Sequence, residues 1–452
     1  MANNNTLCIA EWQAFGVEDI KKVIADSSEA KATKIFNELK DFANDKGNFD
    51  DRKGNHIFLT PYRNNRLQAR NYVGLIQTKS GFCLEILPKT FRTANESQGF
   101  EKHQNKINEA KDLLLKMLQT LRDSPFKQSH ISNLATQNTP LLEIFAIMFL
   151  DELESLIKKG IKSDYVVREE NRAFLKGKLL FSENLKHNFA HKERFFTASD
   201  EFISDIAPNR LIVSTLLFLS RQNFSAKTST RILQSRFVFE GISPSQNYDK
   251  DFAKCANLRH FKAYECLLLW CKVFLKRHNF MPYQGLDKAF ALLFDMNALF
   301  ESFVAWHLKK YVAQKGYKCQ IKAQESSKHL LEVGGVNKFQ MKPDIVCRKD
   351  NAVIFIADTK WKILDFSRSD YGISQGDLYQ IFAYLAKYQC EKGYLIFPKI
   401  EDSKHPLEFS YKFTYKATSN LPSQNPHTLQ ICFFDCQNPK DSIKLIKQYV
   451  CV

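Results

Sequence analysis

The chain has 452 residues, of which 44% are hydrophobic and 25% are charged. This composition excludes a wholly disordered protein, and the length exceeds what one hydrophobic core usually covers, so two or three domains are expected. Lysine and arginine outnumber aspartate and glutamate by 65 to 49, which gives a formal net charge of +16. This excess favours a polyanionic partner, although a generally lysine-rich surface would give the same total because the basic residues are scattered.

Cysteine usage and hydropathy bear on the compartment. Eleven cysteines are spread over the chain without a Cys-x-x-Cys pair, a pattern that indicates neither a zinc site nor a disulfide framework. The most apolar run, residues 144–150, is far shorter than a membrane span, and the opening letters MANNNTLCIAEWQ lack the regions of a signal peptide. We expect a cytoplasmic protein that does not cross a membrane.

Residues 1–100 show a mixed pattern and predict a small β-containing domain. A helical stretch over residues 27–47 precedes three extended segments, HIFLTPY, YVGLIQTKS and FCLEILPKTF. The last two meet at Lys79-Ser80-Gly81, a turn signal between alternating runs. A small sheet or barrel is expected here.

Residues 101–280 predict a mainly helical middle region. Apolar residues recur three and four apart in KINEAKDLLLKMLQTLRD and PLLEIFAIMFLDELESLIKK. An extended stretch, residues 165–181, interrupts the helices, with Gly177 at a turn or bulge. The pair His187 and His191 has the spacing of a helical metal pair, but no third ligand or general-base glutamate lies between them, which favours a DNA-facing or solvated pair.

Residues 281–452 predict an α/β domain. An amphipathic helix is expected over residues 286–313, followed by the strand YKCQIKA, a hairpin, the helix GDLYQIFAYLAKY and the strand GYLIFP. The fold class is therefore a multidomain α+β or α/β protein. It would combine a small N-terminal domain, a helical middle and a C-terminal α/β domain.

The hairpin sequence KPDIVCRKDNAVIFIADTKWK carries charged residues inside two apolar strands. Because strand side chains alternate between faces, Asp358 and Lys360 share one face while Thr359 points away. A turn at residues 349–351 would bring Asp344 beside Asp358. Mg²⁺ is usually held by one or two carboxylates together with phosphate and water, and a nearby ammonium stabilises charge in phosphodiester cleavage. The pattern predicts a Mg²⁺ site with Lys360 beside it; an ordinary exposed hairpin is the alternative.

These letters resemble the motif of the PD-(D/E)xK nuclease superfamily, here as PD ending at Asp344 and DTK ending at Lys360. The resemblance implies a restriction-endonuclease-like fold for residues 281–452 and an acid on the preceding helix that completes the metal site. Glu301 fits that place, because a charge among apolar residues needs a partner or a metal; a glutamate at the solvent edge of the helix is the alternative. On the following helix, Gln380 resembles the polar residue beside the lysine, with Tyr384 as a packing residue.

The whole chain also resembles the McrC family, the nuclease subunits of McrBC-type GTP-dependent restriction systems. One block is LQARNYVGLIQTKSGFCLEILPKTF, a second joins FLKGKL to SDEFISDIAPNRLIVSTL, and the third is the nuclease motif. Together they span most of residues 65–385 in the family's order, whereas the first 60 and last 50 residues match no such pattern. In the second block, Asp205, Asn209 and Arg210 stand at places that match the family's pattern. A purely structural role, in which they cap and pin helices, is the alternative for these residues.

The resemblance implies a division of labour in defence against foreign DNA. A separate McrB-like AAA+ GTPase ring would recognise and translocate double-stranded DNA, while this chain would stimulate GTP hydrolysis through its N-terminal part and cut DNA with its C-terminal part. GTP would be bound by the partner, because no G-x-x-x-x-G-K-[ST] loop occurs here. Dimerisation of nuclease domains is one route to cutting both strands. The N-terminal side chains proposed as partner contacts are Arg63, Arg66, Arg70 and Lys89.

Two alternatives stay open at this point. One is a self-sufficient Mg²⁺-dependent restriction or repair endonuclease that needs no GTPase. The other is a non-cutting adaptor that regulates a GTPase, against which the intact set of Asp344, Asp358 and Lys360 argues.

Overall fold

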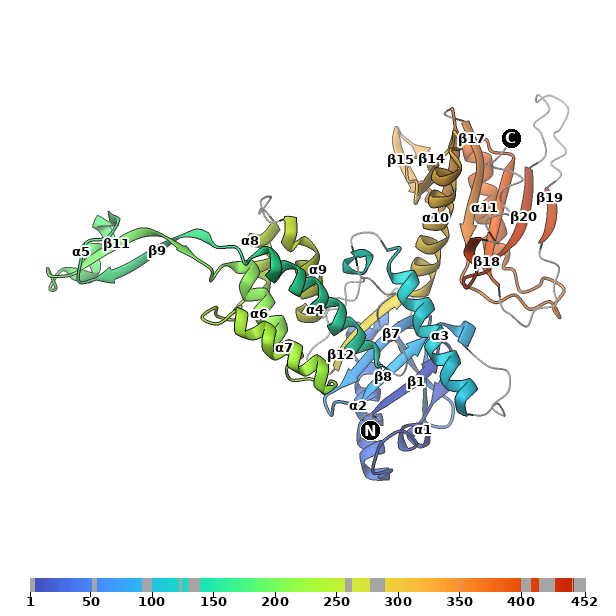
Figure 1. Cartoon of the computed structure of the whole chain (residues 1–452). Helices are drawn as coiled ribbons and strands as arrows, with labels where there is room; N and C mark the ends of the chain where they lie inside the picture. Colours follow the sequence, from blue (N-terminus) through green and yellow to red (C-terminus); the bar gives the residue numbers. More distant parts are fainter. Residues whose placement is uncertain are drawn as a thin grey trace.

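The protein has three parts: an N-terminal sheet with its helices, a helical middle that carries a long arm, and a six-stranded C-terminal sheet (Figure 1). The mixed α+β, multidomain class agrees with the prediction. The structure is a computed structural model, and it describes residues 5–50, 55–91, 100–121, 124–128, 139–256, 262–276, 289–350, 352–399, 408–413, 427–440 and 442.

The N-terminal sheet has the strand order β1-β8-β7-β12. β1 (Thr6–Ala10) and β8 (Cys83–Leu87) are parallel, whereas β7 (Tyr72–Thr78) is antiparallel to β8 and to β12 (Ala289–Asp295). The predicted turn between β7 and β8 is present, with Gly81 at a φ of 82°. α2 (Glu29–Ala43) buries its apolar residues in the same core as this sheet. The remaining elements of this part are α1 (Val17–Lys21), β2 (Ala14–Phe15), β3 (Phe49–Asp50), β4 (Asn55–His56), β5 (Leu59–Tyr62), β6 (Arg66–Ala69) and the 3₁₀ turns at Lys46–Asn48 and Lys89–Phe91.

The middle region packs amphipathic helices around one large apolar core. Aromatic rings fill its centre, where the centroid of Phe126 lies 5.0 Å from that of Trp270 and 5.4 Å from that of Phe145. Such edge-on packing makes the core specific as well as apolar. Its helices are α3 (Phe100–Leu118), α4 (Leu141–Lys159), α6 (Ala207–Leu219), α7 (Ala226–Val238), α8 (Tyr248–Ala256) and α9 (Glu265–Leu275), with 3₁₀ turns at Pro125–Gln128 and Lys262–Tyr264.

A long arm leaves this helical region and projects away from the rest of the molecule (Figure 1). It consists of β9 (Asp164–Arg172) paired antiparallel with β11 (Phe195–Ile203), the short β10 (Lys178–Leu179), and α5 (Phe181–Asn188) at the far end. Gly177 has a φ of 78°, and a Cβ atom there would lie 2.3 Å from the carbonyl oxygen of Ala198. Glycine is required at this close approach to β11, a reason that the predicted turn or bulge at Gly177 did not include.

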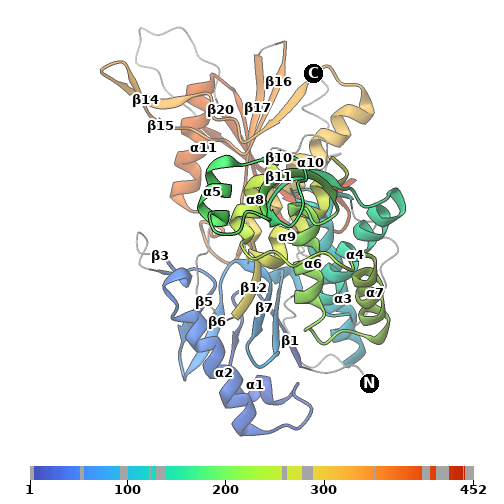
Figure 2. The same ribbon diagram turned by 90° about the vertical axis from the view of Figure 1, so that its left-hand side faces the viewer.

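The C-terminal sheet has the order β13-β16-β17-β18-β20-β19, with α10 and α11 on opposite faces. Alternation along β17 explains this arrangement, because Phe355 and Ala357 join the core of α10 while Ile356 joins the core of α11. A separate hairpin of β14 and β15 extends from this part (Figure 2). The elements are α10 (Met296–Lys315), β13 (Gln320–Ala323), β14 (His329–Val333), β15 (Val336–Gln340), β16 (Ile345–Lys349), β17 (Ala352–Thr359), α11 (Gln375–Tyr388), β18 (Lys392–Pro398), β19 (Glu408–Phe413) and β20 (His427–Phe434).

The helix expected over residues 286–313 is wrong at its start, because residues 289–295 form β12. The apolar run AFALLF fits a buried strand as well as a buried helix, and periodicity alone does not separate the two. Asp295 marks the true beginning of the helix, since its side chain accepts a hydrogen bond from the Asn297 N–H. Residues 289–295, which the prediction placed in the C-terminal domain, thus complete the N-terminal sheet and run directly into α10.

Two observations on membrane helices and cysteines apply to the residues that the structure describes. No helix in the described ranges is both long and apolar enough to cross a membrane. The ten cysteines that lie within those ranges are free thiols.

Candidate functional site

The β16–β17 hairpin brings two carboxylates together, as the sequence predicted. Ile345 pairs with Ala357, so the neighbouring residues Asp344 and Asp358 lie opposite each other where the ladder ends. The hairpin closes through Asp350, which adopts a φ of 48°. The two acids therefore meet at the C-terminal end of β17.

Asp344 is held by Thr359. Its Oδ2 accepts hydrogen bonds of 2.7 Å from both the backbone N–H and the hydroxyl of Thr359. The ladder with β16 has already ended at this position, so the Thr359 N–H bonds a carboxylate in place of a backbone carbonyl. The expectation that Thr359 points away from the cluster is therefore wrong, and the middle residue of the DTK letters orients an acid.

Lys360 lies at the centre of the cluster. Its Nζ is 2.7 Å from Oδ2 of the buried Asp358 and 3.4 Å from Oδ1 of Asp377, and it donates a 2.9 Å hydrogen bond to Oε1 of Gln380. Burial alone would lower the pKa of Lys360, but the neighbouring carboxylates raise it above its usual value. The ammonium is thus charged and held by partners from a strand and a helix.

α11 supplies the polar side chains that face Lys360. The hydroxyl of Ser374 caps the helix by accepting a hydrogen bond from the Asp377 N–H, and Gln380 follows one turn later. The Gln380 amide donates to the Tyr384 hydroxyl at 2.9 Å, and that hydroxyl donates to the carbonyl oxygen of Lys342 at 3.2 Å. Tyr384 therefore packs in the core and also fixes Gln380, which is more than the packing role expected of it.

Glu301 projects from α10 as a half-buried acid. Burial and the negative charge of Asp344 raise its pKa to about 8, although a hydrogen bond from Gln324 opposes the shift. Burial and the charge of Asp344 likewise raise the pKa of Asp358 to about 6, and burial raises that of Asp344. The charges of Asp344 and Asp358 thus act on Glu301, which is half-buried.

The facing carboxylates of Asp344 and Asp358 suit a small hard cation that takes few protein ligands. Among the described residues, no three His, Cys, Asp or Glu side chains converge closely enough to hold a metal ion, so Glu301 does not complete a three-carboxylate cluster in this arrangement. Asp344 and Asp358 remain as a facing pair, and Mg²⁺ typically takes one or two carboxylates plus phosphate and water. The residues present therefore fit Mg²⁺ with Asp344 and Asp358 as ligands.

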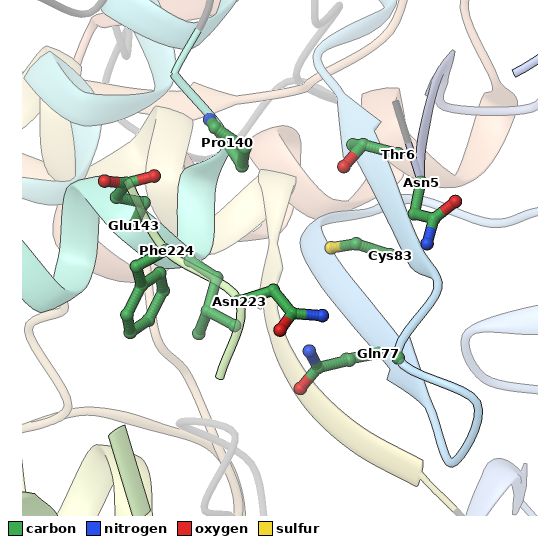
Figure 3. A pocket seen from close by; sticks show the side chains of 10 residues that line it. Asn5, Thr6, Gln77, Cys83, Pro140, Glu143, Asn223 and Phe224 are labelled. Atoms are coloured by element: carbon green, nitrogen blue, oxygen red, sulfur yellow. The ribbon is translucent and has the colours of Figure 1, made fainter. Parts of the chain in front are cut away.

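Other sequence candidates do not gather into sites. His187 and His191 each pair with a nearby acid, at 3.3 Å to Glu183 and 3.1 Å to Glu193. A small pocket between the N-terminal sheet and α4 includes Gln77, Cys83 and Glu143 (Figure 3). None of the described residues that line it is a predicted site residue.

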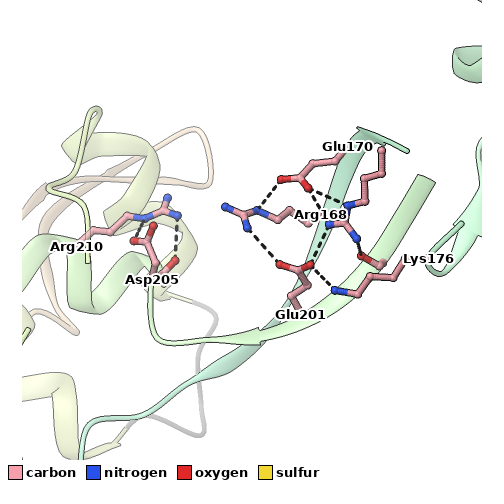
Figure 4. A network of polar contacts seen from close by, with 8 residues as sticks. Arg168, Glu170, Lys176, Glu201, Asp205 and Arg210 are labelled. Atoms are coloured by element: carbon pink, nitrogen blue, oxygen red, sulfur yellow. Dashed lines mark hydrogen bonds and ion pairs between the residues drawn. The ribbon is translucent and has the colours of Figure 1, made fainter. Parts of the chain in front are cut away.

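The central block has a structural role at the base of the arm. Asn209 donates to the carbonyl oxygens of Lys162 and Ser204, and Arg210 forms a 2.7 Å ion pair with Asp205 (Figure 4). These contacts tie both strands of the arm to α6. This is the helix-pinning role that the sequence left open.

The N-terminal basic residues proposed as partner contacts are mostly engaged within the chain. Arg66 pairs with Asp19 at 2.9 Å, and the guanidinium of Arg70 lies 4.8 Å from the ring centroid of Trp12. Lys89 donates to a backbone carbonyl of the C-terminal part. Arg63 remains exposed at the turn between β5 and β6.

The comparisons with known proteins identify the family. The sequence model described as "McrBC 5-methylcytosine restriction system component" matches residues 67–398. This chain belongs to the McrBC family, as its sequence resemblance predicted. No curated protein matches the chain.

Two solved structures match this chain. One is a refined half-complex from a tetradecameric assembly of Thermococcus gammatolerans McrB AAA+ hexamers with bound McrC; a chain in it is 19% identical, with a TM-score of 0.64, and the alignment covers 98% of this chain and 100% of that one. The other is the T. gammatolerans McrBC complex, at 23% identity and a TM-score of 0.44, covering 66% of this chain and 85% of that one. The first similarity shows that the fold is shared over nearly the whole chain.

Proposed function

We propose that this chain is the DNA-cutting subunit of a McrBC-type restriction system, which hydrolyses phosphodiester bonds of double-stranded DNA with Mg²⁺ and acts with an AAA+ GTPase. The observation that carries the proposal is the meeting of Asp344, Asp358, Lys360 and Gln380 at the end of one hairpin, in a chain of the McrBC family. The PD-(D/E)xK assignment of residues 281–452 is part of the same proposal.

The proposed chemistry divides among these residues. Asp344 and Asp358 would hold Mg²⁺, and Glu301 lies near enough for the charge of Asp344 to act on it. A bound ion would polarise a phosphoryl oxygen and lower the pKa of a coordinated water. Lys360, held by Asp358, Asp377 and Gln380, would stabilise the negative charge that develops on the attacked phosphate. The raised pKa values of Glu301 and Asp358 are compatible with this assignment, because a cation would offset both the burial of the acids, which is the larger cause, and the repulsion from Asp344.

The arm is the surface that we assign to the GTPase partner. It exposes large apolar side chains, with Phe181 and Phe189 at its far end and Phe202 near its base, and exposed apolar surface marks interaction sites. Glu201 accepts ion pairs from Arg168, Arg172 and Lys176, which hold β9 and β11 in one conformation (Figure 4). The similar solved structure contains McrC bound to McrB AAA+ hexamers, which makes a ring of that kind the expected partner.

The test is cleavage of double-stranded DNA by the full chain with Mg²⁺, GTP and the cognate GTPase. We expect cutting by the wild-type protein, none after EDTA treatment, and none by Asp358→Asn, which keeps the side-chain shape but removes the charge. Asp350→Asn at the hairpin turn is the matched control, because asparagine tolerates its positive φ. Cutting without the GTPase would favour the self-sufficient endonuclease, whereas GTPase stimulation by a chain that never cuts would favour the adaptor.

A further inference from the structure

The N-terminal sheet and the C-terminal part meet at a buried polar contact around Trp361. This residue directly follows Lys360 and is 5% exposed. Its indole Nε1–H donates to Oε2 of Glu11 at 2.8 Å, and its backbone carbonyl accepts a 2.6 Å hydrogen bond from Nζ of Lys89. The indole N–H and the backbone carbonyl of one residue are thus both held by the N-terminal part.

The topology of the N-terminal sheet explains why Glu11 and Lys89 reach the same place. β1 and β8 are parallel, so the residues that follow them lie at the same edge of the sheet. The Lys89 N–H donates to Oε2 of Glu11 at 3.0 Å, and the Glu11 N–H donates to the carbonyl oxygen of Leu87 at 3.0 Å. Glu11 is fully buried, and a buried carboxylate is costly unless it is hydrogen-bonded. Its Oε2 accepts both the Trp361 and the Lys89 hydrogen bonds, whereas its Oε1 has no hydrogen-bond partner among the described residues. The contact therefore has a specific geometry that an apolar interface would lack.

The indole ring also contacts the other side of the candidate site. Its ring centroid lies 5.2 Å from that of Phe300, which precedes Glu301 on α10. One residue earlier in the chain, the Lys360 N–H donates to the carbonyl oxygen of Ile396 in β18 at 2.9 Å. Trp361 thus joins the N-terminal sheet, the helix that carries Glu301 and the strand end that carries Lys360.

We propose that Glu11 and Lys89 are positioning residues that act through Trp361 to hold the Lys360 ammonium against Asp358. The ammonium keeps partners on β17 and α11 within 3.4 Å, so a small shift of the strand end would break this set. The catalytic consequence rests on the nuclease function proposed above. The structural part of the proposal, that the N-terminal sheet holds the end of β17 in place, is independent of that function.

Three substitutions in the full chain test the clamp formed by Glu11, Lys89 and Trp361. Trp361→Phe keeps the ring against Phe300 and removes the indole N–H, while Glu11→Leu removes the acceptor. Glu11→Gln keeps a side-chain oxygen that can accept both hydrogen bonds and serves as the conservative rescue. Trp270→Phe, the same substitution in the middle core, is the matched control for loss of stability.

Two readouts separate positioning from a structural role. Amide hydrogen exchange of residues 358–362 should become faster in Trp361→Phe and Glu11→Leu but not in Glu11→Gln or Trp270→Phe. In Mg²⁺-dependent cleavage with GTP and the GTPase, kcat should fall on the order of 10- to 100-fold in the first two variants with KM for DNA unchanged, and Glu11→Gln should restore it.

Unchanged exchange and unchanged kcat in Trp361→Phe and Glu11→Leu would overturn the clamp. An equal loss of kcat in Trp270→Phe would also overturn it, because the effect would then follow stability alone. A wild-type chain that cuts no DNA, while the clamp variants still exchange faster, would overturn the nuclease function and support the mechanical contact.

Discussion

At the scale of single residues, Lys360 and its partners decide how the candidate site would work. The ammonium lies 2.7 Å from Oδ2 of Asp358, one of the two proposed metal ligands, so it would share that carboxylate with a bound cation. Removing the ammonium would free the carboxylate for the metal and would take away one of the two positive charges proposed to act on the attacked phosphate. The lysine and the acids should therefore respond differently to mutation.

We expect Lys360→Met to lower the cleavage rate by about 10²-fold or more, since a single positioned electrostatic group is often worth that much. Mg²⁺ affinity, measured by titration calorimetry, should be retained or increased because Asp358 loses its ion pair. Lys362→Met, two residues further on, is the control on the same segment. A parallel loss of metal binding and rate in Lys360→Met would contradict the electrostatic role.

Glu11 gives a prediction about pH and stability. Burial raises its pKa from 4.5 to about 7 in the folded chain. The folded state therefore binds the proton more tightly than the unfolded state, so the resulting stabilisation is present below about pH 4.5 and is lost as pH rises through about 7. Glu11→Gln cannot ionise and should lose this component. Denaturant unfolding of both proteins between pH 4.5 and 8 checks it, and parallel stability curves would rule it out.

The residues of the hairpin could be predicted because strand alternation and a turn place Asp344, Asp358 and Lys360 by local rules. The contact of Glu11 with Trp361 could not, because these residues are 350 positions apart and no local pattern pairs them. Thr359 was misplaced for a similar reason, since its role depends on where the β16 ladder ends. Local sequence patterns determine on which face of a strand a side chain lies, whereas contacts between residues distant in sequence depend on tertiary packing.

At the scale of elements, the arm is the feature that was least predictable from the sequence. An extended stretch over residues 165–181 and a turn or bulge at Gly177 were predicted, but β11, which pairs with β9, was not. The projection of the arm from the molecule depends on which helices bury the rest of the middle region. Its exposed Phe181 and Phe189 are the basis for the proposal that it binds the GTPase. This makes the arm testable separately from the nuclease domain.

We expect Phe189→Ser, in the exposed tip of the arm, to weaken binding to the GTPase and its stimulation while leaving thermal stability unchanged. Burying one phenylalanine side chain is worth roughly 1.5 to 3 kcal/mol, so the dissociation constant should rise on the order of 10- to 100-fold. Phe339→Ser, on the exposed β14–β15 hairpin, is the matched control. Equal effects of both substitutions would remove the assignment to the arm.

The contact between β7 and β12 gives a prediction about stability. A Cβ atom at Gly74 would lie 2.0 Å from the carbonyl oxygen of Leu292, so Gly74→Ala must push β12 away. Gly81→Ala has the same chemistry at a positive φ in open space and should cost about 1 to 2 kcal/mol. We expect a clearly larger loss in Gly74→Ala, measured by thermal unfolding. Similar melting temperatures for the two variants would contradict this packing.

At the scale of the whole molecule, the formal net charge of +16 accords with a DNA substrate. If this chain contacts phosphates, its DNA affinity should fall steeply as salt rises, with a slope that reports the number of phosphates neutralised. Fluorescence anisotropy with a labelled duplex between about 50 and 200 mM salt measures this slope. Affinity that does not change with salt would point to another polyanion or to contacts made by the partner alone.

The pairing of β12 with β7 also bears on how the chain folds during synthesis. β7 leaves the ribosome early, yet its neighbour β12 emerges only after the helical middle and the arm. Until then one edge of the N-terminal sheet is unpaired, and unpaired edges invite aggregation. A nascent chain arrested before residue 289 should therefore expose β7 to proteolysis or to a chaperone, and one arrested after α10 should not. The late strand that completes the sheet also sets the point in synthesis at which the N-terminal part becomes stable.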